Sequence, residues 1–202
     1  MIYVKHVGVL DVQGDITEHA RILEEAARKL HLDAKVVLVN TPKDVEKLSA
    51  LILPGGESTT LGKLLRAYAI DDAIRKIALQ GVPVMGTCAG LIILSRDAGA
   101  QAVKTRQPLL SLLDVTVDRN YFGRQKESFE TELDIPLIGK EPFHGVFIRS
   151  PIVESVGPGV EVLCKFESKI VMVKQKNILG LAFHPELSGD CRIHEYFLRM
   201  MK

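Results

Sequence analysis

A regular alternation of short apolar runs with amphipathic stretches, in the first half of the chain, is the strongest constraint on the fold. Apolar runs of strand length occupy residues 7–12 (VGVLDV), 34–39 (AKVVLV), 50–54 (ALILP) and 82–85 (VPVM). Between the first two runs, apolar residues recur at helical spacing over residues 16–30. Strands separated by helices pair in parallel through right-handed crossovers, so helices cover both faces of the sheet. This half therefore predicts an α/β protein with an open sheet, in a flavodoxin-like three-layer α/β/α arrangement.

The second half of the chain shows strand-like alternation instead. Strands are predicted at residues 112–119, 128–135, 145–152, 160–166 and 169–175, and a last one at 178–183 precedes a final helix from about Asp190. No linker or internal repeat divides the 202 residues. We therefore expect a single domain over residues 1–202, built on a mostly parallel but mixed sheet. Asp15 is expected to cap the first helix.

A cysteine stands between two glycines at the end of the fourth predicted strand, in the stretch GTCAG. Gly86 and Gly90 allow the backbone to bend sharply around Cys88, as at the nucleophile elbow of a hydrolase. The amide of Ala89 lies at the start of the following helix, where free N–H groups stabilise a thiolate and can donate to a developing oxyanion. The alternative is a cysteine that is only buried in a glycine-rich turn.

His184 is the strongest candidate for the base among six histidines. It ends an apolar strand, and Glu186 follows two residues later, on the same side of an extended backbone. A carboxylate there would fix the imidazole tautomer and stabilise its charged form. The sequence therefore favours a Cys88–His184–Glu186 triad over a His-Pro turn beside an exposed glutamate. His144 stays open as an alternative, and surface or packing roles are assigned to the rest: His6, His19, His31 and His194.

Two glycines follow the third predicted strand in the stretch PGGESTT, residues 54–60. Glycine tolerates positive φ, so Gly55 and Gly56 can aim backbone amides inward and complete an oxyanion hole beside Ala89. A phosphate loop is disfavoured because the G-x-x-x-x-G-K-[ST] spacing is absent. A plain turn, with Ser58 or Thr59 capping the next helix, is the structural alternative.

Composition argues against several classes of partner. The net charge is +1, aromatic residues make up 5% and tryptophan is absent, which disfavours nucleic-acid binding. No signal peptide or apolar run of membrane length is evident, so no membrane association is expected. Three widely spaced cysteines favour a reducing cytoplasm and no metal cluster.

These motifs resemble those of class I glutamine amidotransferases. More narrowly, the chain resembles the glutaminase subunit of pyridoxal 5'-phosphate synthase, over nearly its whole length. The stretches that carry the narrower resemblance are LPGGESTT, GTCAGLIIL, RNYFGRQ, SFE, GVFIRSP and FHPEL.

The resemblance implies hydrolysis of L-glutamine to L-glutamate and ammonia, with the ammonia passing to a separate synthase subunit. It implies that Cys88 is the nucleophile, that His184 acts first as base and then as acid, and that Glu186 orients the histidine. No metal or organic cofactor is expected. The positions that correspond to the family's glutamine-binding residues are Gly56, Glu57, Ser58, Arg119, Ile148 and Arg149.

One position departs from the family's pattern, since Asp11 stands where an apolar or small residue is usual. Contact with the synthase, or gating by this loop, could differ as a result. We also expect the free chain to be nearly inactive, with the synthase completing the oxyanion hole at Gly55 and Gly56. The rival hypotheses are the glutaminase of another amidotransferase, a cysteine hydrolase or peptidase of the same fold, and a non-catalytic binding subunit.

Overall fold

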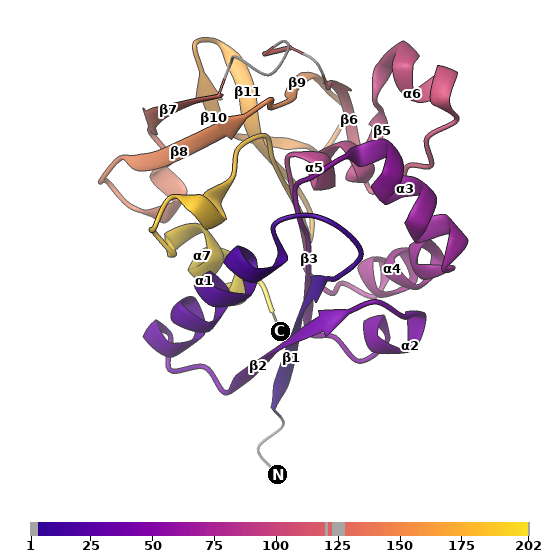
Figure 1. Cartoon of the computed structure of the whole chain (residues 1–202). Coiled ribbons are helices and arrows are strands. Elements are labelled where there is room, and N and C mark those ends of the chain that lie inside the picture. The colour runs from indigo at the N-terminus through magenta and orange to yellow at the C-terminus, as the bar shows by residue number, and fades with distance from the viewer. Residues whose placement is uncertain (1–3, 120, 123–127, 202) are drawn as a thin grey trace.

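The computed structural model describes residues 4–119, 121–122 and 128–201, and over these residues the chain forms a mixed ten-stranded sheet (Figure 1). The strands follow the spatial order β2-β1-β3-β4-β12-β11-β9-β6-β5, with β10 paired to β11. The parallel half contains β2 (Ala34–Val39), β1 (Lys5–Leu10), β3 (Ala50–Leu53), β4 (Val84–Thr87) and β12 (Ile178–Leu181).

The rest of the sheet is mainly antiparallel. It contains β11 (Lys169–Gln175), β10 (Glu161–Phe166), β9 (Ile152–Val156), β6 (Leu113–Asp118) and the short β5 (Ser95–Asp97), which pairs with β6 in parallel. A separate antiparallel pair is formed by β7 (Ser128–Leu133) and β8 (Phe143–Ile148).

Helices lie on both sides of the parallel half of the sheet (Figure 1). One side carries α1 (Ile16–Lys29) and α7 (Arg192–Arg199), which contact each other. The other side carries α2 (Pro42–Val45), α3 (Ser58–Ala67), α4 (Ile70–Leu79) and α5 (Ala89–Leu94). Shorter elements are α6 (Gly99–Thr105) and the 3-10 turns η1 (Pro136–Ile138) and η2 (Pro185–Leu187). The predicted α/β class and its mixed open sheet are confirmed.

Several predicted strands had wrong boundaries, and the fourth lies at Val84–Thr87 rather than at residues 82–85. The first extends from Lys5 to Leu10 rather than over residues 7–12, because its parallel pairing with β2 ends at Leu10↔Val39. The predicted strand 145–152 is wrong as one element. The chain turns at Arg149, whose φ is 45°, and divides the apolar run between β8 and β9.

A cluster of phenylalanines fastens the β7–β8 pair to the main sheet. The rings of Phe129 and Phe147 stack with centroids 4.7 Å apart, and Phe147 meets Phe183, just after β12, at 5.6 Å. Phe147 and Phe183 are completely buried, and each contributes on the order of 2 kcal/mol through the apolar surface that it removes from water. The His184 N–H, next in the chain, donates to the carbonyl of Val146 at 2.8 Å. The cluster thereby fixes the position of β8 relative to His184.

Within residues 4–119, 121–122 and 128–201, no helix is both long and apolar enough to cross a membrane.

Candidate active site

Cys88 occupies a strained turn between β4 and α5. Its φ is 49°, in the left-handed region that residues with a side chain rarely adopt. A Cβ at Gly90 would overlap the carbonyl oxygen of Leu53, so only glycine fits there. The Cys88 N–H donates to the carbonyl of Leu181 at 2.8 Å, which anchors the turn to β12. The strand, turn and helix expected around the cysteine are all present.

His184 and Glu186 lie beside this turn because β12 pairs with β4. Nδ1 of His184 lies 2.7 Å from Oε1 of Glu186, and both side chains are buried. The Cys88 thiol raises the pKa of the same imidazole, although Nε2 of His184 is buried without a hydrogen-bond partner among the described residues. Because Nδ1 is engaged by the carboxylate, Nε2 is the ring nitrogen left for the thiol. The structure therefore brings together the three residues proposed as a triad from the sequence.

Asp15 adds a second carboxylate to the histidine. Its Oδ2 lies 3.4 Å from Nδ1 of His184, and the hydrogen bond to this histidine lowers the pKa of Asp15. Burial by itself lowers the pKa of His184, but its hydrogen bonds with Asp15, Cys88 and Glu186 outweigh burial and raise the pKa to about 12. Burial raises the pKa of Glu186. The expectation that Asp15 caps α1 is wrong, since its side chain forms no capping hydrogen bond and turns to His184 instead.

The two-glycine loop passes over the imidazole. A Cβ on Gly55 would lie 2.6 Å from Cε1 of His184, and Gly56 has a φ of 130°. The Gln13 side-chain amide anchors this loop through the backbone of Glu57. In the amide orientation that satisfies both groups, its nitrogen donates to the carbonyl of Glu57 at 3.0 Å and its oxygen accepts from the Glu57 N–H at 2.7 Å. The sequence analysis assigned no role to Gln13.

Glu57 is the cap of α3, so neither Ser58 nor Thr59 has the capping role that the structural alternative gave them. Its carboxylate accepts from the N–H groups of Thr59 at 3.1 Å and Thr60 at 2.7 Å. Burial alone would raise the pKa of Glu57, but these hydrogen bonds lower it to about 2. Nη2 of Arg119 lies 3.3 Å from Oε1 of the same carboxylate. Two of the predicted glutamine-binding side chains therefore meet at the start of α3.

The remaining predicted binding residues differ in burial and in their contacts. The carbonyl of Ile148 accepts a weak hydrogen bond from the Cys88 thiol at 3.9 Å, whereas the Arg149 side chain is exposed. Ser58 is buried, and its hydroxyl has no hydrogen-bond partner among the described residues. In the quoted stretch RNYFGRQ, residues 120 and 123–125 lie outside the described residues.

Two further residues near the site were not predicted as site residues by the sequence analysis. Gln107 accepts from Arg119 at 2.7 Å. His19 was given a surface or packing role, yet its Nε2 lies 3.3 Å from Oε2 of Glu186. No motif or spacing signals this contact in the sequence, because it arises from the packing of α1 against the segment that follows β12.

Among the described residues, one group has the spacing of metal ligands. It comprises Asp15, His184 and Glu186, whose ligand atoms lie within 4.8 Å of one another. The two carboxylates in this group are those that contact the His184 imidazole, and Nδ1 of His184 is already hydrogen-bonded to Glu186. The absence of a metal stays a prediction.

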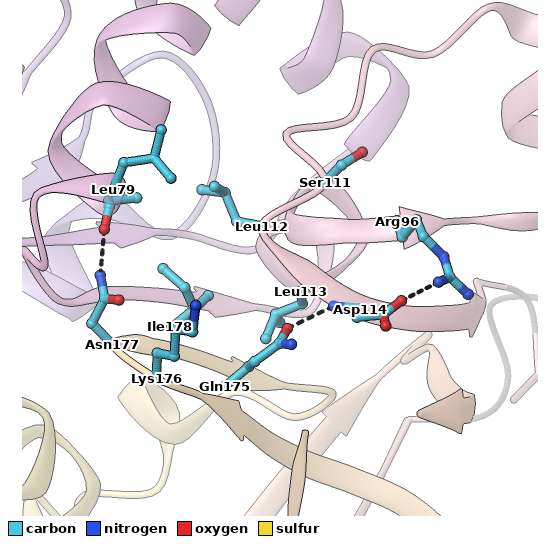
Figure 2. A pocket seen from close by; sticks show the side chains of 11 residues that line it. Leu79, Arg96, Ser111, Leu112, Leu113, Asp114, Gln175, Lys176, Asn177 and Ile178 are labelled. Carbon is cyan, nitrogen blue, oxygen red and sulfur yellow. Dashed lines mark hydrogen bonds and ion pairs between the residues drawn. The ribbon is translucent and has the colours of Figure 1, made fainter. Parts of the chain in front are cut away.

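A separate cavity of about 500 Å³ lies away from these residues (Figure 2). Arg96 and Asp114 form an ion pair in its wall, and Asn177 and Ile178 border it where β12 begins. Because His184 follows the other end of β12, this cavity lies at the amino ends of the strands. Its lining contains none of the predicted site residues.

The candidate site therefore combines a cysteine on a strand–helix turn, a histidine–glutamate pair after the neighbouring parallel strand, and a glycine loop. On an open α/β sheet this arrangement is that of the class I glutamine amidotransferases. The SNO glutamine amidotransferase family matches residues 9–202. The chain belongs to this family.

Relatives and solved structures agree with this membership. A protein of Archaeoglobus fulgidus named "Pyridoxal 5'-phosphate synthase subunit PdxT" is 52% identical over 194 residues, which cover 96% of this chain and 97% of that protein. One of Pelotomaculum thermopropionicum with the same name is 50% identical over 192 residues, covering 95% and 93%. A crystal structure described as a glutamine amidotransferase superposes with a TM-score of 0.84 at 46% identity, covering 96% of this chain and 97% of that one.

Proposed function

We propose that this glutamine amidotransferase hydrolyses L-glutamine to L-glutamate and ammonia with Cys88, His184 and Glu186 as its triad. The observation that carries the proposal is the 2.7 Å contact between His184 Nδ1 and Glu186 Oε1, with Cys88 held beside this pair by the 2.8 Å hydrogen bond from its N–H to the carbonyl of Leu181. A thiol, a base and an orienting carboxylate in this order are the components of nucleophilic acyl transfer.

The proposed reaction has two steps. The Cys88 sulfur attacks the side-chain carboxamide carbon of glutamine, and the proton from the thiol passes through His184 to the departing ammonia. Water, deprotonated by His184, then breaks the thioester to give glutamate and the free thiol. The backbone N–H groups of Gly56 and Ala89 are the proposed oxyanion donors, each worth on the order of 3 kcal/mol in the transition state. These steps need no metal or organic cofactor.

Charged groups near the thiol suit a zwitterionic amino acid. Glu57 is ionised at neutral pH and can accept from the ammonium, while the guanidinium groups of Arg119 and Arg149 can donate to the carboxylate. We assign Ser58 and Ile148 to the same glutamine site. The support for this assignment is the meeting of Glu57 and Arg119 at the start of α3 and the approach of the Ile148 carbonyl to Cys88.

We further propose that the chain works as the glutaminase subunit of pyridoxal 5'-phosphate synthase and passes ammonia to a separate synthase subunit. The support is the name of the relatives that are about half identical over nearly their whole length. The Gly55–Gly56 peptide can adopt more than one orientation, and so the synthase could complete the oxyanion hole on binding. We place the complex in the cytoplasm, since the three cysteines are free thiols, as is typical of a reducing compartment.

Substitution of the nucleophile tests the triad. We expect Cys88→Ala to abolish release of glutamate from glutamine while the far-UV circular dichroism spectrum stays unchanged. Cys164→Ala is the matched control, because burial raises the pKa of that thiol to about 11 and makes it a poor nucleophile. Undiminished hydrolysis by Cys88→Ala would exclude the triad.

Substrate and partner need separate measurements. A panel of small peptides assayed beside glutamine distinguishes a glutaminase from a peptidase of the same fold. The glutamine rate measured with and without the synthase subunit tests the control by the partner. We expect a marked increase on complex formation, and equal rates would contradict it.

A further inference from the structure

A buried pair of histidines lies directly behind the carboxylate of Glu186. His19 projects from α1 and His194 from α7, and both are fully inaccessible to solvent. Nδ1 of His19 lies 3.3 Å from Nε2 of His194, and the two ring centroids are 5.6 Å apart. Buried polar groups such as these imidazole nitrogens need hydrogen-bond partners.

The other nitrogen of His19 faces the proposed triad. Nε2 lies 3.1 Å from Oγ1 of Thr87, the residue before the nucleophile, and 3.3 Å from Oε2 of Glu186. His184 occupies Oε1 of Glu186, whereas no hydrogen bond of good geometry reaches Oε2 from any described residue. An unsatisfied buried carboxylate oxygen is costly, and His19 Nε2 is the nitrogen within reach of it.

The protonation of the pair can be inferred from burial. Desolvation lowers the pKa of His19 well below its ordinary value, and the nearby His194 and His184 lower it further. Desolvation also lowers the pKa of His194 to about 3. Both imidazoles are therefore neutral at pH 7, and each carries one proton.

The unused nitrogen of His194 indicates where these protons lie. Its Nδ1 is buried without a hydrogen-bond partner among the described residues. The free-energy cost of burying an unpaired lone pair at this nitrogen is smaller than that of burying an unpaired N–H. The His194 proton is then on Nε2 and is donated to Nδ1 of His19. His19 must in turn carry its proton on Nε2, where it faces Glu186 and Thr87.

We propose that His19 is a positioning residue for the triad: its Nε2–H, fixed by His194, holds Glu186 in the orientation that aligns His184 with Cys88. The inference rests on the proposed triad. His19 does not touch the substrate in this scheme; it acts through the carboxylate. The competing explanation is a purely structural role in packing α1 against α7 and the sheet.

Two isosteric substitutions separate the positioning role from the structural one. His19→Gln keeps an amide N–H near the position of Nε2, whereas His19→Asn places its amide near Nδ1 and removes the nitrogen that lies 3.3 Å from Oε2 of Glu186. We expect His19→Asn to lower kcat about ten- to a hundredfold, the factor for a lost interaction between an N–H and a charged group, with KM nearly unchanged. His19→Gln should retain most of the activity. Equal losses in both variants, or none in His19→Asn, would overturn the proposal.

The pH dependence of thiol alkylation gives a readout that packing alone would not move. A poorly held Glu186 stabilises the His184 imidazolium less, so the midpoint of Cys88 alkylation by iodoacetamide should move to higher pH in His19→Asn. Ile22→Val, a mild change to a buried residue one turn along α1, is the matched control and should leave the midpoint in place. An unshifted midpoint in His19→Asn would count against the proposal.

Nitrogen NMR of histidine-labelled wild-type protein needs no variant and so decides the matter even if His19→Asn does not fold. We expect His19 and His194 both to be neutral at pH 7 with their protons on Nε2, and a proton on Nδ1 of His19 would refute the proposal.

Cys88→Ala, assayed in parallel, distinguishes failure of the proposed triad from failure of the positioning role. If it remains active, the triad itself is wrong. If it is inactive while His19→Asn equals wild type, only the positioning role is lost.

Discussion

The strained conformation of Cys88 is maintained by its neighbours. With φ at 49°, the turn holds Cys88 beside the end of β12, and Gly90 makes this possible by packing directly on the carbonyl of Leu53. Backbone strain of this kind persists only where the surroundings enforce it. The glycines on either side of the cysteine are therefore required by the nucleophile's geometry.

A substitution at Gly90 should consequently damage the fold as well as activity. We expect Gly90→Ala to lower the free energy of unfolding by about 3 kcal/mol or more, because the new methyl group would meet rigid backbone. Gly189→Ala is the control, since that glycine has a φ of 74° with open space around it and should cost only about 1 to 2 kcal/mol. Urea denaturation of both variants makes the comparison, and equal losses would show that the contact with Leu53 carries no special weight.

Glu57 should make the stability depend on pH in the acid range. Its folded pKa of about 2 lies below the ordinary value of 4.5, so its stabilisation is complete above pH 4.5 and is lost as the pH falls toward 2. The side chain is 52% exposed, and solvent screening limits the effect to about 1 kcal/mol. Glu57→Gln should flatten this part of the stability curve in urea titrations between pH 2 and 6. A variant curve that parallels the wild type would contradict the assignment.

At the scale of elements, the β7–β8 pair supports the site from outside the main sheet. Its strand β8 accepts the His184 N–H at the Val146 carbonyl and brings the Ile148 carbonyl to the Cys88 thiol. At the outer end of the pair, His144 lies across the strands from Glu132, 3.2 Å from its carboxylate, and 2.8 Å from that of Glu130. One exposed imidazole thus joins two carboxylates of β7. His144, which the sequence analysis left open as a candidate base, has its ring nitrogens engaged by these glutamates.

This arrangement predicts that the β7–β8 pair weakens as the pH rises. Hydrogen bonds to Glu132 and Glu130 raise the pKa of His144, so its stabilisation is complete below pH 6.5 and is lost as the pH passes through the raised value. Amide exchange in β8, corrected for the intrinsic rate, should therefore accelerate more between pH 6 and 9 than exchange in β3. His144→Gln should remove the difference, and its persistence in that variant would assign the effect to another group.

The elements that the sequence predicted well are those whose burial is uniform. β3 is a completely buried parallel strand, and a continuous apolar run indicates such a strand directly. The turn at Arg149 was missed because an arginine rather than a glycine adopts the positive φ there. At the site, Cys88 and His184 have local motifs that indicate their chemistry. The roles of Gln13 and His19 depend on which residues the fold packs against them, and spacing alone does not reveal that.

At the scale of the whole molecule, β12 joins parts of the chain that are distant in sequence. It pairs in parallel with β4 on one side and antiparallel with β11 on the other, so it completes the interior of the sheet. Without β12, neither neighbour would have a partner on that edge. The single domain predicted over residues 1–202 stays a prediction, and this topology is the argument for it.

We therefore expect one cooperative unfolding transition. Tyrosine fluorescence and far-UV circular dichroism should give coincident urea curves, because β12 joins the parallel and antiparallel halves of the sheet and the two halves cannot separate without exposing it. A chain truncated before residue 176 should fail to form a stable fold. Two separated transitions, or a folded truncated chain, would show that the halves are independent units.

The place of β12 in the sheet also sets the time at which the enzyme can become active during its own synthesis. His184 and Glu186 leave the ribosome long after Cys88, and the sheet remains open at its centre until they do. In the proposed triad, a nascent chain therefore carries its thiol without the imidazole that would activate it. Every unfinished copy would then leave cellular glutamine untouched, since catalytic competence would arrive together with the completed fold.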